Sequence, residues 1–289
     1  MSITGIFGES FDTIWKYPKA ILPYLVMELV ISLLVIIAVF ELAGTAVATG
    51  IISAGFWALI IGIIVMSFVI GMFITPLFYG VYTNIEVQKL KRKRLSLRSA
   101  YDATKTRYGT LFWAGLANLA IYLAIIIVFA GLLLGYIGAN GTVLAALGSV
   151  HTGAVHTSVL RPLVALAGFL LLWAVLLVLC TGIAAIFLFQ YVPIVILEKR
   201  GALDSIKRSF EVGRKNFWSI LGVLVIYMII VLLVYFVVGI ISTPFDLASR
   251  AAGSLVQILI SSIVGSFVYP WYIMIMTSFY NSYVRKIAQ

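Results

Sequence analysis

The chain has 289 residues, of which 63% are hydrophobic and 10% are charged, and its net charge is +10. A soluble domain is closer to half apolar and a quarter charged, so the composition excludes an ordinary soluble protein and predicts a membrane protein. Such a positive charge would suggest nucleic-acid binding in a soluble protein. Here membrane topology accounts for the charge, and anionic lipid headgroups are the expected partners.

Six apolar stretches follow one another along the chain, each long enough to cross the bilayer as a helix of about 20 residues. They cover residues 21–43, 51–79, 111–137, 163–197, 220–241 and 255–279. The fourth is longer than a span requires, so we expect it to tilt, to kink at Pro193 or to project beyond the bilayer. The sequence therefore predicts an all-α, multi-pass membrane protein that forms a single six-span domain, residues 1–289.

The distribution of basic residues predicts the orientation of this domain. Of the 20 Lys and Arg residues, all but Arg161 and Arg250 lie before the first span, in the loops 89–107 and 199–215, or after the last span. These segments alternate to the same side, and positively charged segments resist translocation. Both termini are therefore expected in the cytoplasm, with the protein in the cell membrane.

The three cytoplasmic segments that precede the odd-numbered spans resemble one another. The pairs Phe11-Asp12, Tyr101-Asp102 and Phe210-Glu211 each place an aromatic residue before an acid, and an apolar residue stands four positions earlier in each copy. This spacing puts the apolar side chains on one helix face and the basic ones opposite. We expect a short amphipathic helix at the cytoplasmic interface in each copy; the alternative is an ordinary solvated loop helix.

The even-numbered spans also share a feature, since Pro76, Pro193 and Pro270 each lie near the cytoplasmic end of their span. Together with the amphipathic segments, this predicts one unit used three times: an interfacial helix followed by a helical hairpin. The units cover about 1–80, 81–197 and 198–289. Two spans per unit preserve orientation, so the expected symmetry is a pseudo-threefold axis along the membrane normal, unlike inverted repeats.

Two further segments carry a family resemblance. They are the run Pro193-Ile-Val-Ile-Leu-Glu-Lys-Arg-Gly201 with the following Arg214-Lys-Asn-Phe-Trp218, and Ile14-Trp-Lys-Tyr-Pro-Lys19 before the first span. These resemble the membrane domain attached to some glycerophosphodiester phosphodiesterases and related six-span proteins of archaea and bacteria. The phosphodiesterase domain with its metal site is absent from the chain. The resemblance implies a fold and a membrane setting, not an activity.

The chain carries no nucleotide-binding loop, nucleophile elbow or metalloprotease motif, and it predicts no cofactor. His151 and His156 are five residues apart without acids nearby, which fits a polar loop better than a metal site. Cys180 is the only cysteine and is expected to be a small core residue. No catalytic pair is recognisable, so the sequence predicts a protein that is not an enzyme.

Glu28 is the candidate for an intramembrane site, because an acid about two turns inside a span is costly without a partner. The repeat offsets carry Glu28 onto Asn118 and then onto Tyr227 in the other odd-numbered spans. If those spans line the axis, the three side chains form one polar pocket for a cation, a proton or a lipid headgroup. The alternative is a structural network in which they bond to one another without a ligand.

The densest basic cluster is a candidate surface for lipid headgroups. Its residues are Lys89, Lys91, Arg92, Lys93, Arg94 and Arg98. Each adds about 1 kcal/mol of attraction near an anionic leaflet. The function that follows is a non-enzymatic scaffold or accessory subunit that engages lipid, a membrane partner or a second copy. The alternative is a carrier or channel for a small solute, cation or lipid, acting through the predicted pocket.

Overall fold

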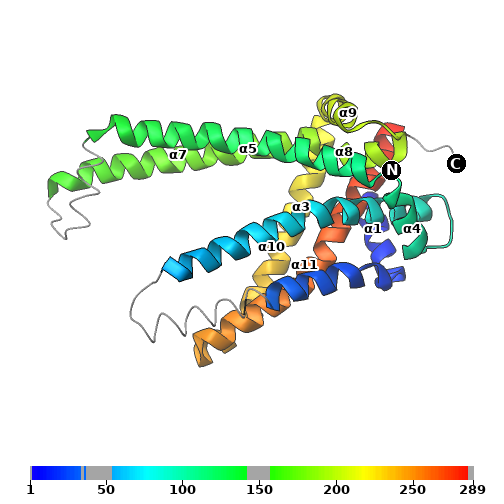
Figure 1. Cartoon of the computed structure of the whole chain (residues 1–289), viewed down its shortest axis with the longest axis horizontal. Helices are drawn as coiled ribbons and strands as arrows, with labels where there is room; N and C mark the ends of the chain where they lie inside the picture. The colour runs from blue at the N-terminus through cyan, green and yellow to red at the C-terminus, as the bar shows by residue number, and fades with distance from the viewer. Residues whose placement is uncertain (1, 34–35, 37–53, 142–156, 286–289) are drawn as a thin grey trace.

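The computed structural model describes residues 2–33, 36, 54–141 and 157–285, and the described residues form helices with no strand. The main helices are α1 (Ile3–Lys16), Leu22–Leu33, α3 (Ala54–Leu90), α4 (Leu97–Lys105), α5 (Tyr108–Ala139), α7 (Thr157–Leu188), α9 (Ala202–Lys215), α10 (Phe217–Ala248) and α11 (Arg250–Phe279). Short turns complete them: η1 (Pro18–Ala20), α8 (Tyr191–Pro193), η2 (Ile194–Glu198) and η3 (Tyr280–Arg285). The all-helical prediction is thus confirmed (Figure 1).

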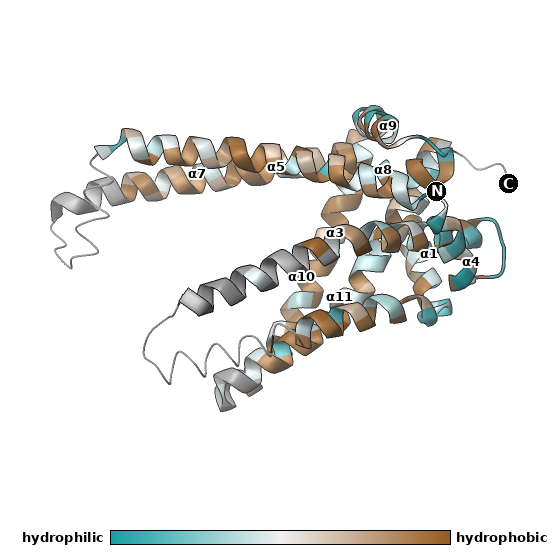
Figure 2. Ribbon diagram, viewed as in Figure 1, coloured by the Kyte–Doolittle hydropathy of each residue, from teal (hydrophilic) through white to brown (hydrophobic). Residues whose placement is uncertain are grey.

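Four of the described helices are long and apolar enough to cross a membrane: Tyr108–Ala139, Val164–Glu198, Phe217–Phe245 and Gly253–Val284. Figure 2 shows that they are apolar along most of their length, with hydrophilic residues gathered around α4 and α9. Very little of the first three helices is buried inside the protein. A helix that is apolar all round and packs on few neighbours is suited to face lipid.

The buried core lies at one end of the molecule, where the short amphipathic helices meet the ends of α3, α7 and α11. Its largest fully buried side chains include Ile6, Tyr82, Phe189, Ile220 and Phe279. Beyond this end α5 and α7 run side by side (Figure 1), joined by a hydrogen bond of 2.7 Å from the Trp173 indole to the Phe129 carbonyl. This packed region is called the cytoplasmic end below, after the topology that the sequence predicts.

All three predicted amphipathic helices are present, as α1, α4 and α9. Their aromatic residues Phe11, Tyr101 and Phe210 are each about half exposed. Directly before each aromatic stands a small residue that is completely buried: Ser10, Ala100 and Ser209 respectively. These small residues let each short helix approach the spans closely.

The three short helices pack in a related way. Helix α1 lies on α11, α4 lies on α3, and α9 lies on α7 and to the same extent on α5. Each therefore contacts an even-numbered predicted span that precedes it in the chain, except that α1, having none before it, contacts the last one. The beginning and the end of the chain thus pack against each other.

The prolines disturb the helices, and hydroxyl groups compensate. The fourth predicted span breaks at Phe189–Gln190, four residues before Pro193, because proline offers no N–H to that turn. The Ser209 hydroxyl donates to the Phe187 carbonyl at 2.8 Å and accepts from the Gln190 amide at 3.1 Å. Of the three outcomes expected for this span, the kink is confirmed.

Near the other two prolines the helices continue, and tyrosines supply the hydrogen bonds. The Tyr108 hydroxyl donates to the carbonyl of Phe73, three residues before Pro76, at 2.9 Å. The Tyr227 hydroxyl donates to the carbonyl of Val268, two residues before Pro270, at 3.2 Å. Neither acceptor is the carbonyl that the proline leaves without its helical donor, which lies four residues before it, at Met72 and at Ser266. The two hydroxyls add a hydrogen bond to the turns that precede the prolines.

Candidate functional site

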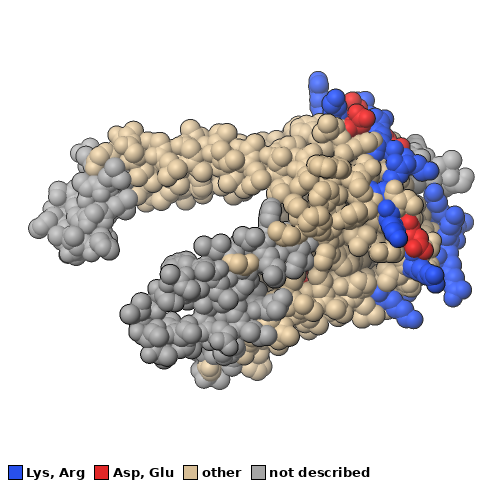
Figure 3. All heavy atoms as spheres, in the orientation of Figure 1, with Lys and Arg blue, Asp and Glu red and all other residues tan. Residues whose placement is uncertain are grey.

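The basic side chains form one continuous region over the cytoplasmic end (Figure 3), as the charge pattern predicts. The turn that follows α3 and the first residues of α4 contribute exposed residues to it: Lys91, Arg92, Lys93, Arg94 and Arg98. Gln88 holds this turn, since its side chain accepts from the Ser96 amide at 2.8 Å and donates to the Ser96 carbonyl at 3.3 Å. The five exposed cations are therefore displayed on an anchored loop.

Lys89 differs from the prediction that placed it on this surface. Its side chain is only 23% exposed and its Nζ lies 3.5 Å from Asp12 Oδ2. It also donates a hydrogen bond to the Glu9 carbonyl on α1. Lys89 therefore joins α3 to α1, and the exposed cluster consists of the other five residues.

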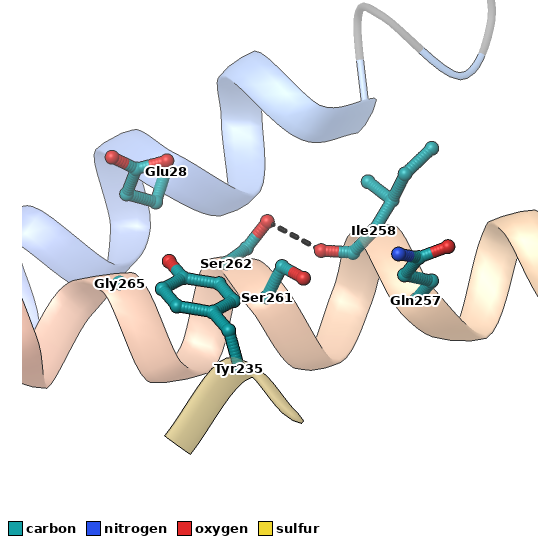
Figure 4. Close-up of a pocket in the computed structure, with 7 residues that line it drawn as sticks. All are labelled: Glu28, Tyr235, Gln257, Ile258, Ser261, Ser262 and Gly265. Carbon is teal, nitrogen blue, oxygen red and sulfur yellow. Dashed lines mark hydrogen bonds between the residues drawn. The ribbon is translucent and has the colours of Figure 1, made fainter. Parts of the chain in front are cut away.

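Glu28 lines a cavity of about 400 Å³ between its own helix and the last two long helices. The other lining residues are Tyr235 from α10 and Gln257, Ile258, Ser261, Ser262 and Gly265 from α11 (Figure 4). Tyr24 lies one turn before Glu28 on the same helix, and its hydroxyl lies near the carboxylate. Tyr24 in turn stacks on Tyr269 with ring centroids 5.0 Å apart. The carboxylate thus lies at the cavity wall beside a packed aromatic residue.

Asn118 and Tyr227, the two residues predicted to share a pocket with Glu28, do not line this cavity. Asn118 interacts with the Tyr191 hydroxyl, and its Oδ1 atom is buried without a hydrogen-bond partner among the described residues. Tyr227 bonds to the Val268 carbonyl and packs against Trp271 and Tyr272. The repeat offset places these residues at equivalent positions in sequence, but their side chains find different partners.

A second acid, Glu86, is completely buried near the end of α3. Its Oε2 accepts a hydrogen bond of 2.6 Å from Thr13 on α1, and its Oε1 accepts one of 2.7 Å from Ser278 on α11. Two more side-chain bonds link α3 to α11: Tyr269 donates to Tyr79 at 2.6 Å and Thr277 to Thr83 at 3.3 Å. Glu86 therefore fixes three helices at one point.

The surroundings of Glu86 favour its protonated form. Glu86 lies beyond the predicted end of its span at Tyr79, and burial raises the pKa of its carboxyl above the usual 4.5, although Thr13, Ser278 and Lys89 oppose this. The Thr13 hydroxyl lies within 3.1 Å of the Glu9 carbonyl as well as near Glu86. A hydroxyl has one proton, so both contacts are satisfied when Glu86 donates to Thr13 and Thr13 donates to Glu9.

A second acid at this end, Glu198, follows Pro193 near the end of its predicted span, as Glu86 follows Pro76. Glu198 ends η2, and it accepts hydrogen bonds from Arg200 at 2.5 Å and from the Tyr280 hydroxyl. Its other basic neighbour is Arg208 of α9, at 3.7 Å. No group of three or more His, Cys, Asp or Glu side chains within the described ranges is arranged to hold a metal ion.

Comparison with known families gives one match, to a family described as "Domain of unknown function (DUF7847)", over residues 21–283. The chain belongs to this family. The match includes Glu28, Glu86, the basic turn and all four candidate spans, whereas α1, with Thr13, lies outside it. No curated protein and no solved structure matches the chain. The resemblance to phosphodiesterase-associated membrane domains stays a prediction.

Sequence reasoning missed Glu86, because an acid that stands near basic residues in the sequence is usually paired with them at the surface. A periodic signal was available: Tyr79, Thr83 and Glu86 are spaced by four and three residues, which puts them on one face of α3. All three bond to α11. His151 and His156, which were expected in a polar loop, lie outside the described residues.

Proposed function

We propose that this protein is a non-enzymatic integral membrane protein that organises anionic lipid around its cytoplasmic end. The observation that supports the proposal most directly is the basic region of Figure 3, over the same end as α1, α4 and α9. The exposed aromatic residues Trp15 and Trp218 belong to this end as well. Aromatic rings and cations at one level are typical of a surface at the membrane–water interface.

The topology is part of this proposal: six spans, both termini in the cytoplasm of the cell, and three units related by rotation. The contacts of α1 with α11, α4 with α3 and α9 with α7 support the rotation, because each unit's short helix meets a neighbouring unit's second span. A reporter fused after Gln289 should remain cytoplasmic, and one inserted at Gly153 should be exterior. The opposite result would reject the topology and with it the lipid assignment.

We prefer lipid organisation to a carrier or channel. The carrier hypothesis required Glu28, Asn118 and Tyr227 to share one pocket, and the Asn118 and Tyr227 contacts lead elsewhere. The basic surface, by contrast, is assembled from residues of several helices and displayed outward.

The experiment measures the lipid that surrounds the protein. The purified protein is reconstituted in vesicles that contain a fixed fraction of phosphatidylglycerol in phosphatidylcholine, then excised with a styrene–maleic acid copolymer. We expect phosphatidylglycerol to be enriched in the particles relative to the vesicle. Enrichment should fall when Lys91, Arg92, Lys93 and Arg94 are replaced by Gln, because each cation contributes about 1 kcal/mol of attraction.

The matched control exchanges Lys and Arg at these four positions, which keeps the charge and should keep the enrichment. A second variant with all four residues replaced by Glu should exclude phosphatidylglycerol. Enrichment that is the same in the wild type and in the Gln and Glu variants would overturn the proposal.

A further inference from the structure

The cavity beside Glu28 plays no part in lipid organisation, and its chemistry points to a ligand of its own. Figure 4 shows Glu28 and Tyr235 on two different helices, with Ser261 and Ser262 of α11 beside them and Gln257 farther along α11. The lining is rich in oxygen atoms although the surrounding helices are apolar. A concave site with a few convergent polar groups in apolar surroundings is the usual form of a small-molecule site.

The charge of the cavity is negative. Among the described residues, Glu28 is the one carboxylate in the lining, no Lys, Arg or His lines the cavity, and Glu28 forms no ion pair. A carboxylate in an apolar region without a charged partner favours a cation beside it.

The size of the cavity favours an organic cation over a metal ion. A volume of about 400 Å³ falls within the range of roughly 300–1,000 Å³ typical of small-molecule sites. A divalent metal ion prefers six or more oxygen ligands, including several carboxylates, at short range, and here one carboxylate is present. An organic cation matches both the volume and the single negative charge.

We propose that this cavity binds a small organic ammonium ion. The ammonium group lies against Glu28, the Tyr235 ring forms a cation–π face, and the oxygens of Ser261 and Gln257 accept hydrogen bonds from the rest of the ligand. The cavity has room beside Gly265, since a methyl group added there would approach nothing closer than the Tyr235 hydroxyl at 3.8 Å. The ammonium can belong to a free amine or to a lipid headgroup.

Choline and its uncharged carbon analogue 3,3-dimethylbutan-1-ol are matched probes, because they have the same shape and differ in charge. Binding of each to the purified protein is measured by calorimetry in phosphatidylglycerol nanodiscs. We expect choline to bind and the neutral analogue to bind at least about tenfold more weakly, as the loss of a charged contact implies. Repeating the titration in nanodiscs that contain phosphatidylcholine identifies the source: competition indicates a headgroup, and unchanged binding indicates a free amine.

Variants test the residues. Glu28→Gln keeps the shape, removes the charge and should abolish choline binding, whereas Asp102→Asn removes an exposed acid of α4 and should leave it intact. Gly265→Ala should bind normally, and Gly265→Leu should block the cavity. Melting temperature and elution volume verify that each variant is folded. Equal binding of choline by wild type and folded Glu28→Gln, or equal binding of the neutral analogue, would reject the ammonium site and leave the lipid proposal unaffected.

Discussion

The close contact between α3 and α4 leads to a quantitative prediction for Gly80→Ala. A Cβ atom built on Gly80 would lie 2.3 Å from Thr104 Cγ2 and 2.7 Å from Leu111 Cδ1. Carbon atoms in contact are normally about 3.5–4.0 Å apart, so Thr104 would have to move by about 1 Å. Thr104 is completely buried and its hydroxyl donates to the Ala100 carbonyl at 2.8 Å, which restricts that movement.

We expect Gly80→Ala to lower the free energy of unfolding by about 1–3 kcal/mol, the usual cost of overpacking a core. The higher helix propensity of alanine offsets up to about 1 kcal/mol of this loss. The control is Gly131→Ala in α5, where an added methyl group would meet no atom within 4 Å. That substitution should be neutral or stabilising.

Thr104→Ser is the compensating change, because it removes the clashing methyl group and keeps the hydroxyl that accepts from Asn84 at 3.0 Å. The free energies of unfolding of the wild type, the two single variants and the double variant are measured by SDS titration in mixed micelles, followed by tryptophan fluorescence. The loss of unfolding free energy in the double variant should be smaller than the sum of the losses in the two single variants by about 0.5 kcal/mol or more. Additive changes, or a Gly80→Ala protein as stable as the wild type, would refute the close contact.

Three further changes test the cytoplasmic end and the proline turns. Because the pKa of Glu86 is raised, the folded state holds a proton that the unfolded state releases near 4.5. Stability should therefore be greatest below that pH and decline as pH rises through the folded-state pKa. Glu86→Gln should flatten this profile when melting is measured as a function of pH. Glu9, Asp12 and Lys89 are the remaining charged neighbours. An unchanged profile would show that Glu86 is not the source of the pH dependence. Tyr227→Phe should lower the free energy of unfolding in SDS titration by about 0.5–1.5 kcal/mol, because it removes the hydrogen bond to the Val268 carbonyl; no loss would show that this bond does not stabilise the fold. Arg92→Gly should raise the melting temperature, since Arg92 has a φ of 53°, a conformation that costs an ordinary residue about 1 kcal/mol; Arg94→Gly is the control, and an equal rise in both would count against this explanation.

The sequence predicted the helical class, the amphipathic segments and the charged end, because these depend on periodicity and composition, which are local properties. The break before Pro193 was also predictable, since proline acts on its own helix. The partners of Asn118 and Tyr227 were not, because a rotation of a helix by a fraction of a turn redirects a side chain without changing its position in the repeat. Glu86 was missed for a related reason: its burial depends on Thr13 and Ser278, which lie far away in sequence.

The contact between α1 and α11 has a consequence for synthesis at the ribosome. The buried face of α1, including Ile6, Phe7 and Ser10, is completed by residues that are translated more than 260 residues later, among them Ser278 and Phe279. Until those residues leave the ribosome, this face lacks its α11 neighbours, and an amphipathic helix with an incomplete apolar contact can rest on the bilayer surface. Packing of this end is therefore completed only after α11 has been synthesised. A ribosome stalled before Ser278 should therefore hold a nascent chain whose α1 remains open to protease, and release of the full chain should protect it.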